Sequence, residues 1–195
     1  MKNNKIQQNI PAGVTKTILM NQLLGCSVQA KGIYLNIYSE SIKEAYKLLD
    51  ESTLLFKNQS YQRAYFLGFA ALEEISKSQL AADVYTGLVS EEEFKKSYRD
   101  HKKKIARVEW IKIDGNSFPH FNSDLIRIDD FDFQKKLKSM YVDVDFSSEV
   151  ISSPNDSISK DDAESIIKAV EVGLYRIYQV TVEDGEQIGT KGFMK

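Results

Sequence analysis

Apolar residues recur every three or four positions over four stretches of this chain, which is the spacing of an amphipathic α-helix. The four stretches cover residues 34–57, 61–85, 90–112 and 159–182. Within the second stretch, residues 64–72 carry no charge. Neighbouring helices usually cover such a helix on all sides, so we expect it at the centre of the fold. Gly68 lowers its stability by roughly 1 kcal/mol relative to Ala, which indicates close packing against another helix at that point.

Polar residues mark where three of these helices begin. Ser90 stands three residues before Glu93, and Ser159 stands three residues before Asp162. Each pair predicts a capping box, in which the side chains and backbone N–H groups of the first turn bond to each other. Ser60 is the expected N-cap of the second helix.

The segments between and beyond the helices are more polar. Residues 114–134 lose the helical period and predict a solvated connection, and residues 147–157 predict a polar loop. Residues 140–146 alternate apolar and acidic side chains, which is typical of a short extended segment. A short helix is predicted at residues 14–24. The sequence therefore predicts an all-α fold, a bundle of four to five helices with one short extended segment. Its expected parts are an N-terminal extension, a helical domain and a polar tail, at residues 1–33, 34–183 and 184–195.

The composition is that of an ordinary soluble globular protein, with 42% hydrophobic and 28% charged residues. The formal net charge of -2 disfavours a general nucleic-acid coat protein. Basic residues still crowd residues 95–107, so a basic strip remains for contact with phosphate groups. Cys26 is the only cysteine, which excludes an intrachain disulfide and gives no sign of an oxidising compartment. The apolar run near the N-terminus is too short to span a membrane, so the cytoplasm is the expected location.

Three ionisable residues, Glu73, Glu74 and Lys77, follow the uncharged stretch. Either glutamate can pair with Lys77, because helical residues three or four positions apart are neighbours. A surface salt bridge of this kind contributes only about 0–1 kcal/mol. One of the two glutamates must, however, share a face with the apolar residues before it. A carboxylate there needs a cation or a hydrogen-bond donor from a neighbouring helix.

His101 is the candidate partner, because it falls within the apolar stripe of the helix predicted over residues 90–112. The stripe consists of Phe94, Tyr98, His101, Ile105, Val108 and Ile111. A histidine there is either a core residue bonded to a backbone carbonyl or a general acid/base near neutral pH. Lys104 lies one turn further on, placed to neutralise a phosphate while the imidazole moves a proton. Lys95, Lys102 and Lys103 of the same strip are candidate contacts for RNA phosphates.

We expect no metal and no cofactor. The other histidine, His120, lies in a predicted loop, and no cysteine cluster is present. The acidic run at residues 129–132 lacks the glycine and the terminal glutamate of a calcium loop and is interpreted as solvated surface. Cys26 has no base partner. The absence of a glycine-rich phosphate loop disfavours a nucleotide-binding module.

Taken in order along the chain, these features resemble the AbiV family of abortive-infection proteins, a branch of the HEPN superfamily. The matching residues are Ala64, Ala71, Glu73, Glu74, Lys77, His101, Lys104 and Tyr141-Val142-Asp143. The resemblance implies a HEPN-like helical bundle that pairs as a homodimer. It also implies bacterial antiphage defence, in which an infected cell halts its growth or protein synthesis before the phage matures. Many HEPN proteins are metal-independent ribonucleases that use a spaced arginine and histidine near the dimer interface.

The chain departs from that pattern at the arginine. Phe94, Lys95 and Lys96 occupy the positions where the family places it. Lysine neutralises a phosphate, but it cannot bind one through two parallel hydrogen bonds as arginine does. Ribonuclease activity is therefore less well supported by the resemblance than the fold is.

Two hypotheses for the function remain. The first is an RNA-cleaving toxin in which His101 is the acid/base, Lys104 assists it, and Glu73, Glu74 and Lys77 orient it or balance charge. The second is a non-catalytic dimeric switch that binds a phage protein or the translation machinery. A latent toxin needs a trigger, so we expect a phage-encoded protein as a partner. RNA or the ribosome is a further expected partner, and a membrane is not.

Overall fold

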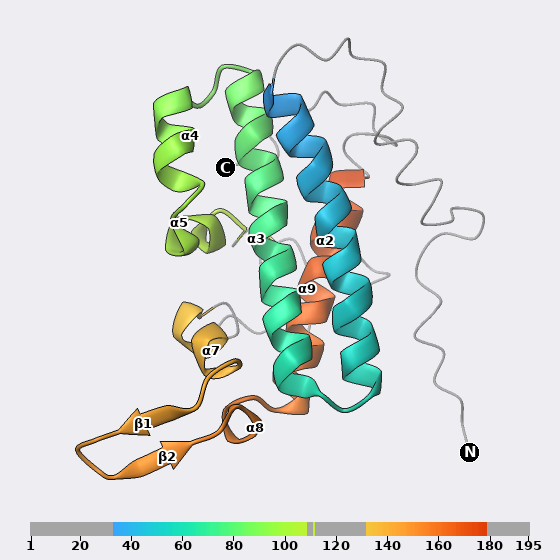
Figure 1. Cartoon of the computed structure of the whole chain (residues 1–195). Helices are drawn as coiled ribbons and strands as arrows, with labels where there is room; N and C mark the ends of the chain where they lie inside the picture. Colours follow the sequence, from blue (N-terminus) through green and yellow to red (C-terminus); the bar gives the residue numbers. More distant parts are fainter. Residues whose placement is uncertain (1–32, 109–110, 112–131, 179–195) are drawn as a thin grey trace, which may run out of the picture.

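The computed structural model describes residues 33–108, 111 and 132–178. Figure 1 shows long helices packed side by side, with shorter elements along one flank. In chain order the elements are α2 (Ile33–Lys57), α3 (Tyr61–Tyr85), α4 (Glu91–Ser97), α5 (His101–Ala106), α7 (Phe133–Lys138), β1 (Asp143–Asp145), β2 (Val150–Ser152), α8 (Pro154–Ser157) and α9 (Lys160–Tyr178). The predicted helical fold is confirmed, and its strands form one small hairpin.

Helix α3 lies at the centre of the bundle, as its uncharged stretch predicts. Helices α2 and α3 run side by side, and α9 packs against both (Figure 1). Helix α3 also contacts α4, α5, α7 and α8, so it touches every other helix of the described residues. Fifteen of its 25 residues are buried. Because neighbouring helices cover α3, a polar residue on it can be buried between them, and Glu73 is such a residue.

The close packing expected at Gly68 is confirmed. A Cβ atom at this position would lie 2.7 Å from Cγ2 of Ile166 in α9 and 3.5 Å from Oγ of Ser52 in α2. Ser52 is itself buried and donates its hydroxyl hydrogen to the carbonyl oxygen of Ala64 at 2.7 Å. Three helices therefore meet at a point where only glycine leaves enough room.

The predicted capping box is confirmed in full at Ser159 and in part at Ser90, where only the serine side chain makes its bond. Ser90 Oγ accepts a hydrogen bond from the backbone N–H of Glu93 at 3.1 Å. Ser159 and Asp162 exchange both hydrogen bonds of a capping box, at 2.8 and 3.2 Å. Ser60 stands at the N-cap position of α3, but its side chain makes no capping hydrogen bond.

The prediction of one helix over residues 90–112 is wrong, because α4 and α5 are separate helices. Asp100 causes the break: its side chain accepts hydrogen bonds from the backbone N–H groups of Lys102 and Lys103 and so caps a new helix. His101 becomes the first residue of α5, and its side chain is 47% exposed instead of turned into the core. Tyr98 is also exposed, whereas the other members of the predicted stripe are buried.

Helix α7 and strand β2 are missed by the sequence analysis. Asp132 is exposed, as predicted for the acidic run, and it also caps α7 by accepting a hydrogen bond from the backbone N–H of Gln134 at 2.9 Å. The predicted extended segment is confirmed at β1, which pairs with β2 so that Val144 lies opposite Ile151. The polar loop predicted over residues 147–157 is therefore wrong in part, because it contains β2 and α8.

Several predictions concern residues outside those described. They are the helix at residues 14–24, the polar tail, the last turn of the helix predicted to end at residue 182, Cys26 and His120. Among the helices that the structure describes, none is long and apolar enough to cross a membrane.

Gly68→Ala tests the three-helix contact. Alanine raises helix stability by roughly 1 kcal/mol, but its methyl group would overlap Ile166, and overpacking a core costs about 1–3 kcal/mol. We expect the free energy of unfolding, measured by urea denaturation, to fall by about 1 kcal/mol. In an Ile166→Ala background the overlap is gone, so the same substitution should stabilise the protein. A loss in both backgrounds would contradict the packing argument.

Candidate functional site

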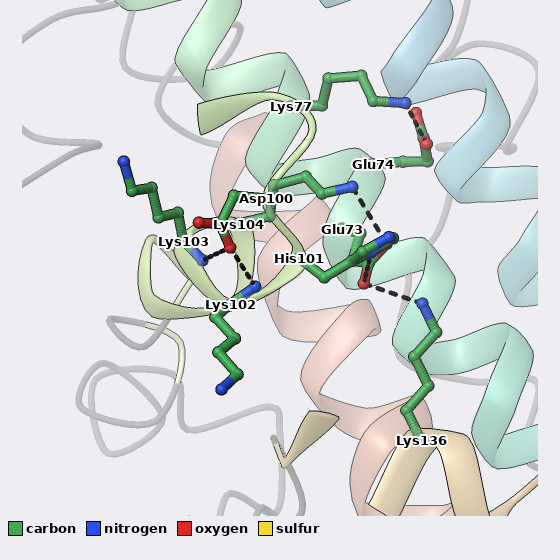
Figure 2. Close-up of polar contacts among 9 residues, drawn as sticks. All are labelled: Glu73, Glu74, Lys77, Asp100, His101, Lys102, Lys103, Lys104 and Lys136. Carbon is green, nitrogen blue, oxygen red and sulfur yellow. Dashed lines mark hydrogen bonds and ion pairs between the residues drawn. The ribbon is translucent and has the colours of Figure 1, made fainter. Parts of the chain in front are cut away.

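A buried carboxylate on α3 gathers three nitrogen donors around it (Figure 2). Glu73 Oε1 lies 2.8 Å from Nδ1 of His101 and accepts a hydrogen bond from Nζ of Lys136 at 2.9 Å. The other oxygen, Oε2, accepts from Nζ of Lys104 at 3.3 Å. Glu73, Lys104 and Lys136 are only 5, 6 and 7% exposed. Glu73 is therefore the glutamate that was predicted to need a partner, and His101 is one of its partners.

Short helices on either side of α3 deliver these donors. His101 and Lys104 stand one turn apart on α5, so both side chains reach the same carboxylate. The capping of α5 by Asp100 fixes where that turn begins. Lys136 comes from α7, and its own turn is closed by Ser139, which donates its hydroxyl hydrogen to the Lys136 carbonyl at 2.6 Å.

Charge is unbalanced in this cluster, since two buried ammonium groups face one carboxylate. Burial by itself raises the pKa of Glu73. The hydrogen bonds and positive charges of Lys136, His101 and Lys104 outweigh burial and hold that pKa below its ordinary value of 4.5. Glu73 is therefore ionised at neutral pH. The Lys136 ammonium also lies 5.1 Å from the ring centroid of Phe69, over whose face a cation is attracted.

His101 joins this cluster to the solvent. Its ring stacks on Phe133 of α7, with centroids 5.2 Å apart and planes 22° from parallel. Because a carboxylate only accepts hydrogen bonds, the Nδ1 atom beside Glu73 carries the proton. The neutral ring then has its lone pair on Nε2. No described residue bonds to Nε2, and the half-exposed ring leaves it free to meet a substrate.

Exposed lysines border His101 on its own helix. Lys102 and Lys103 extend into solvent, and Figure 2 shows both side chains pointing away from Glu73. Neither makes an ion pair with a described residue, so their charges are free to attract an anion. Lys95 of α4 is also exposed, but its ammonium lies 3.9 Å from the carboxylate of Glu91.

Glu74 and Lys77 form a separate ion pair one residue further along α3 (Figure 2). They line an open groove of about 550 Å³ between α2, α3 and α4, which also contains Phe94 and Tyr98. The structure therefore divides the predicted set: Glu73, His101 and Lys104 come together, while Glu74 and Lys77 face another part of the surface.

A second ion pair ties the far end of α5 to α3. Arg107 donates from Nη2 to Oδ2 of Asp83 at 3.2 Å, and Asp83 is only 2% exposed. Burial raises the pKa of Asp83 to about 6, although the charge of Arg107 acts in the opposite direction. Glu73 and Asp83 of α3 therefore bind side chains from the two ends of α5.

Lys136 is the site residue that sequence reasoning misses. It lies 63 positions after Glu73, so no helical spacing connects the two. A weak local signal exists: Asp132 precedes Phe133, Lys136 and Leu137 in the pattern of an N-cap followed by one helical turn. A turn this short cannot be told from a loop by periodicity.

The described residues contain no group of three or more His, Cys, Asp or Glu side chains that could hold a metal ion. The polar atoms around Glu73 are donors, apart from its own two oxygens.

Comparison with known proteins gives one match. The family model described as AbiV, a class of HEPN domain, matches residues 33–174. Searches of the curated proteins and of the solved structures returned no match. The matched span begins at α2, ends within α9 and includes every residue of the cluster around Glu73.

Glu73→Gln tests the cluster, with Glu74→Gln as its matched control. Removing the charge leaves two buried ammonium groups uncompensated, and breaking a buried ion pair costs about 3–5 kcal/mol. We expect a loss of this size in the free energy of unfolding. The same change at half-buried Glu74 should cost about 0–1 kcal/mol. Equal losses at the two positions would contradict the role given to Glu73.

The lowered pKa of Glu73 also predicts a pH dependence. Its stabilising effect is present above the unfolded pKa of 4.5 and is lost as the pH falls through the lower folded value. Stability measured on the acid side should therefore fall less steeply in Glu73→Gln than in the wild type.

Asp83→Asn tests the ion pair between Asp83 and Arg107. The pKa of Asp83 is raised on folding, so its effect on the pH dependence of stability is opposite in sign to that of Glu73. Between pH 3.8 and about 6, the folded state binds more protons at Asp83 than the unfolded state does. Rising pH therefore lowers stability across this window, by on the order of 1–3 kcal/mol. The variant should lack that fall in chemical denaturation at a series of pH values. Asp162→Asn is the control, because the pKa of Asp162 is lowered to about 2 instead of raised, so this variant should keep the fall in stability with rising pH.

Proposed function

Since the chain belongs to the AbiV family of HEPN domains, we propose that it is a bacterial abortive-infection protein that stops host growth or translation on phage infection. We further propose metal-independent RNA cleavage at His101 as its chemistry. Membership of the family supports the first statement. The second is supported by the geometry at Glu73, which gives a partly exposed histidine the environment of a general base.

The observation that carries the chemistry is the 2.8 Å contact between Glu73 Oε1 and His101 Nδ1. The buried carboxylate fixes the tautomer and the orientation of the ring. Its charge also favours the positive charge that the imidazole gains when Nε2 takes a proton, while the two ammonium groups beside it oppose that charge. Glu73 is thus a positioning residue, and His101 is the residue that meets the substrate.

The reaction that suits one fixed imidazole is cleavage by the neighbouring 2′-hydroxyl of RNA. His101 Nε2 takes the proton of the 2′-hydroxyl, and the 2′ oxygen forms a bond to the adjacent phosphorus. The bond from phosphorus to the 5′ oxygen of the next nucleotide breaks, and that oxygen takes a proton from water. The hydroxide left behind takes the proton held by His101 and restores the neutral ring. The products are a 2′,3′-cyclic phosphate and a 5′-hydroxyl, without net oxidation or reduction.

In this proposal the exposed lysines bind the phosphate groups of the RNA. Lys102 and Lys103 follow His101 in the sequence and make no ion pair with a described residue, and Lys95 lies on the preceding helix. Lys104 and Lys136 instead neutralise Glu73. Their excess positive charge attracts the phosphodiester toward the side of the cluster where His101 meets solvent. Binding should therefore weaken with rising salt, as contacts of this kind release counterions.

The partners we propose follow from this role. A homodimer is implied by the family resemblance, and a phage-encoded protein is the expected trigger of an otherwise latent toxin. RNA or the ribosome is the expected target.

A non-catalytic switch is the alternative, favoured by the absent arginine. Of the three positions where the family places it, Phe94 is buried, and Lys95 and Lys96 make ion pairs with glutamates of their own helix. In this alternative the dimer arrests translation by binding, and RNA stays intact.

His101→Gln tests the catalytic proposal. Glutamine keeps a polar side chain near Glu73 but cannot act as a base at neutral pH. We expect phage resistance in cells to fall to the level without the gene. We also expect new RNA ends, seen when purified protein and its trigger are incubated with total RNA, to disappear. Lys102→Gln with Lys103→Gln should weaken cleavage and reduce its salt dependence.

Two controls make this result interpretable. Circular dichroism and thermal unfolding must show that His101→Gln remains folded, and Glu74→Gln should keep both activities. Translation arrest with intact RNA in the wild type would overturn the cleavage proposal and favour the switch.

A further inference from the structure

Two nitrogen atoms share one oxygen of Glu73 (Figure 2). Oε1 lies 2.8 Å from Nδ1 of His101 and 2.9 Å from Nζ of Lys136. The two nitrogens are therefore less than about 6 Å apart, a range over which a charge opposes a second charge of the same sign. Lys104 bonds to the other oxygen, Oε2, at the longer distance of 3.3 Å. Of the two buried ammonium groups, Lys136 is the one that shares an oxygen with His101.

Three aromatic rings surround the Lys136 ammonium. It lies 5.1, 5.5 and 5.8 Å from the ring centroids of Phe69, Phe66 and Phe133. The face of each ring attracts a cation, and Lys136 is only 7% exposed, so water screens its charge little. Phe133 also stacks on His101. Helix α7 therefore supplies both the ring against which His101 lies and the charge beside its Nδ1 atom.

The contact with Glu73 has a cost for a general base. A carboxylate beside an imidazole favours the protonated, positively charged ring. A ring that already holds a proton on Nε2 cannot take one from a 2′-hydroxyl. Orientation by Glu73 is therefore useful only if another group opposes protonation of His101 before the substrate arrives.

We propose that Lys136 is a positioning residue that keeps the His101 ring uncharged until RNA binds. The inference rests on the function proposed for His101 and deepens it. The shared oxygen still orients the ring through the 2.8 Å contact, while the charge of Lys136 opposes a second proton on the imidazole. The phosphate of the RNA then brings negative charge to the solvent side of the ring. That charge favours protonation when Nε2 must take the proton of the 2′-hydroxyl.

The other charged groups on α3, α5 and α7 act less directly on His101. The carboxylates of Asp100 and Asp132 cap α5 and α7 and are bonded to backbone N–H groups. The rest are exposed to water, which screens their charge, or belong to the ion pairs Glu74–Lys77, Asp83–Arg107 and Lys135–Asp162. The charge on the ring is therefore set mainly by Glu73, Lys104 and Lys136.

Lys136→Met tests the inference in the full-length protein. Methionine packs well against aromatic rings, and its introduction leaves one ammonium facing one carboxylate, so the variant should remain folded. We expect the ratio of protonated to neutral His101 ring at a given pH to rise about 10-fold. An NMR titration of the imidazole signals measures this ratio. The chain has two histidines, and His101→Gln identifies which signals belong to His101.

Two further variants separate the charge of Lys136 from its packing. Lys136→Arg keeps the charge and should restore the titration of the wild type. Lys138→Met removes a positive charge from an exposed position of the same helix and should leave the titration of His101 unchanged. An unchanged titration in Lys136→Met, or an equal change in Lys138→Met, overturns the inference.

RNA cleavage gives a second readout. On the acid side of the pH profile, kcat of Lys136→Met should fall about 10-fold, and at alkaline pH it should return to the wild-type level. A loss of kcat that is equal at every pH would mean that Lys136 has only a structural role. If the wild type does not cleave RNA, the proposed function fails, and the NMR titration still decides whether Lys136 keeps the ring neutral.

Discussion

Burial of the Glu73 carboxylate is the constraint on which this part of the molecule depends. An ionised carboxylate under the neighbours of a central helix is tolerated only when donors and positive charge compensate for lost water. Here the compensation comes from α5 and α7, two helices of six residues each. Helices so short are not stable alone. The ion cluster therefore satisfies Glu73 and also fixes where these two helices lie against α3.

The same constraint sets the chemistry of His101. A histidine in the core, as the stripe of residues 90–112 suggests, would be shielded from any substrate. The cap at Asp100 moves it to the first position of α5, where Glu73 holds one ring nitrogen and the other side of the ring meets solvent. A carboxylate behind a partly exposed imidazole is the arrangement that general-base chemistry requires. The cap at Asp100 therefore separates α4 from α5 and also places His101 where the proposed chemistry needs it.

The sequence predicts the parts of this structure that depend on local pattern. The long helices, the central place of α3, the glycine contact at Gly68 and the partnership of a glutamate with His101 all follow from spacing and from the cost of burying charge. What it does not predict depends on residues far apart in the chain. Lys136 reaches Glu73 only through the fold, and β2 has too few residues for alternation to be visible. The break at Asp100 is a competition between a continuous stripe and a strong N-cap, which periodicity alone cannot decide.

Stability is a poor explanation for the cluster around Glu73. Replacing a buried ion pair by apolar residues of similar volume is often neutral or stabilising, by about 1–4 kcal/mol. This site goes further, because it buries two ammonium groups against one carboxylate and so retains a positive charge that no other described residue neutralises. An apolar junction between α3, α5 and α7 would hold the helices with less desolvation. The excess charge lies behind His101, where the phosphate of the proposed substrate would supply the missing negative charge. The anion binding that we propose therefore accounts for the composition of this site better than folding does.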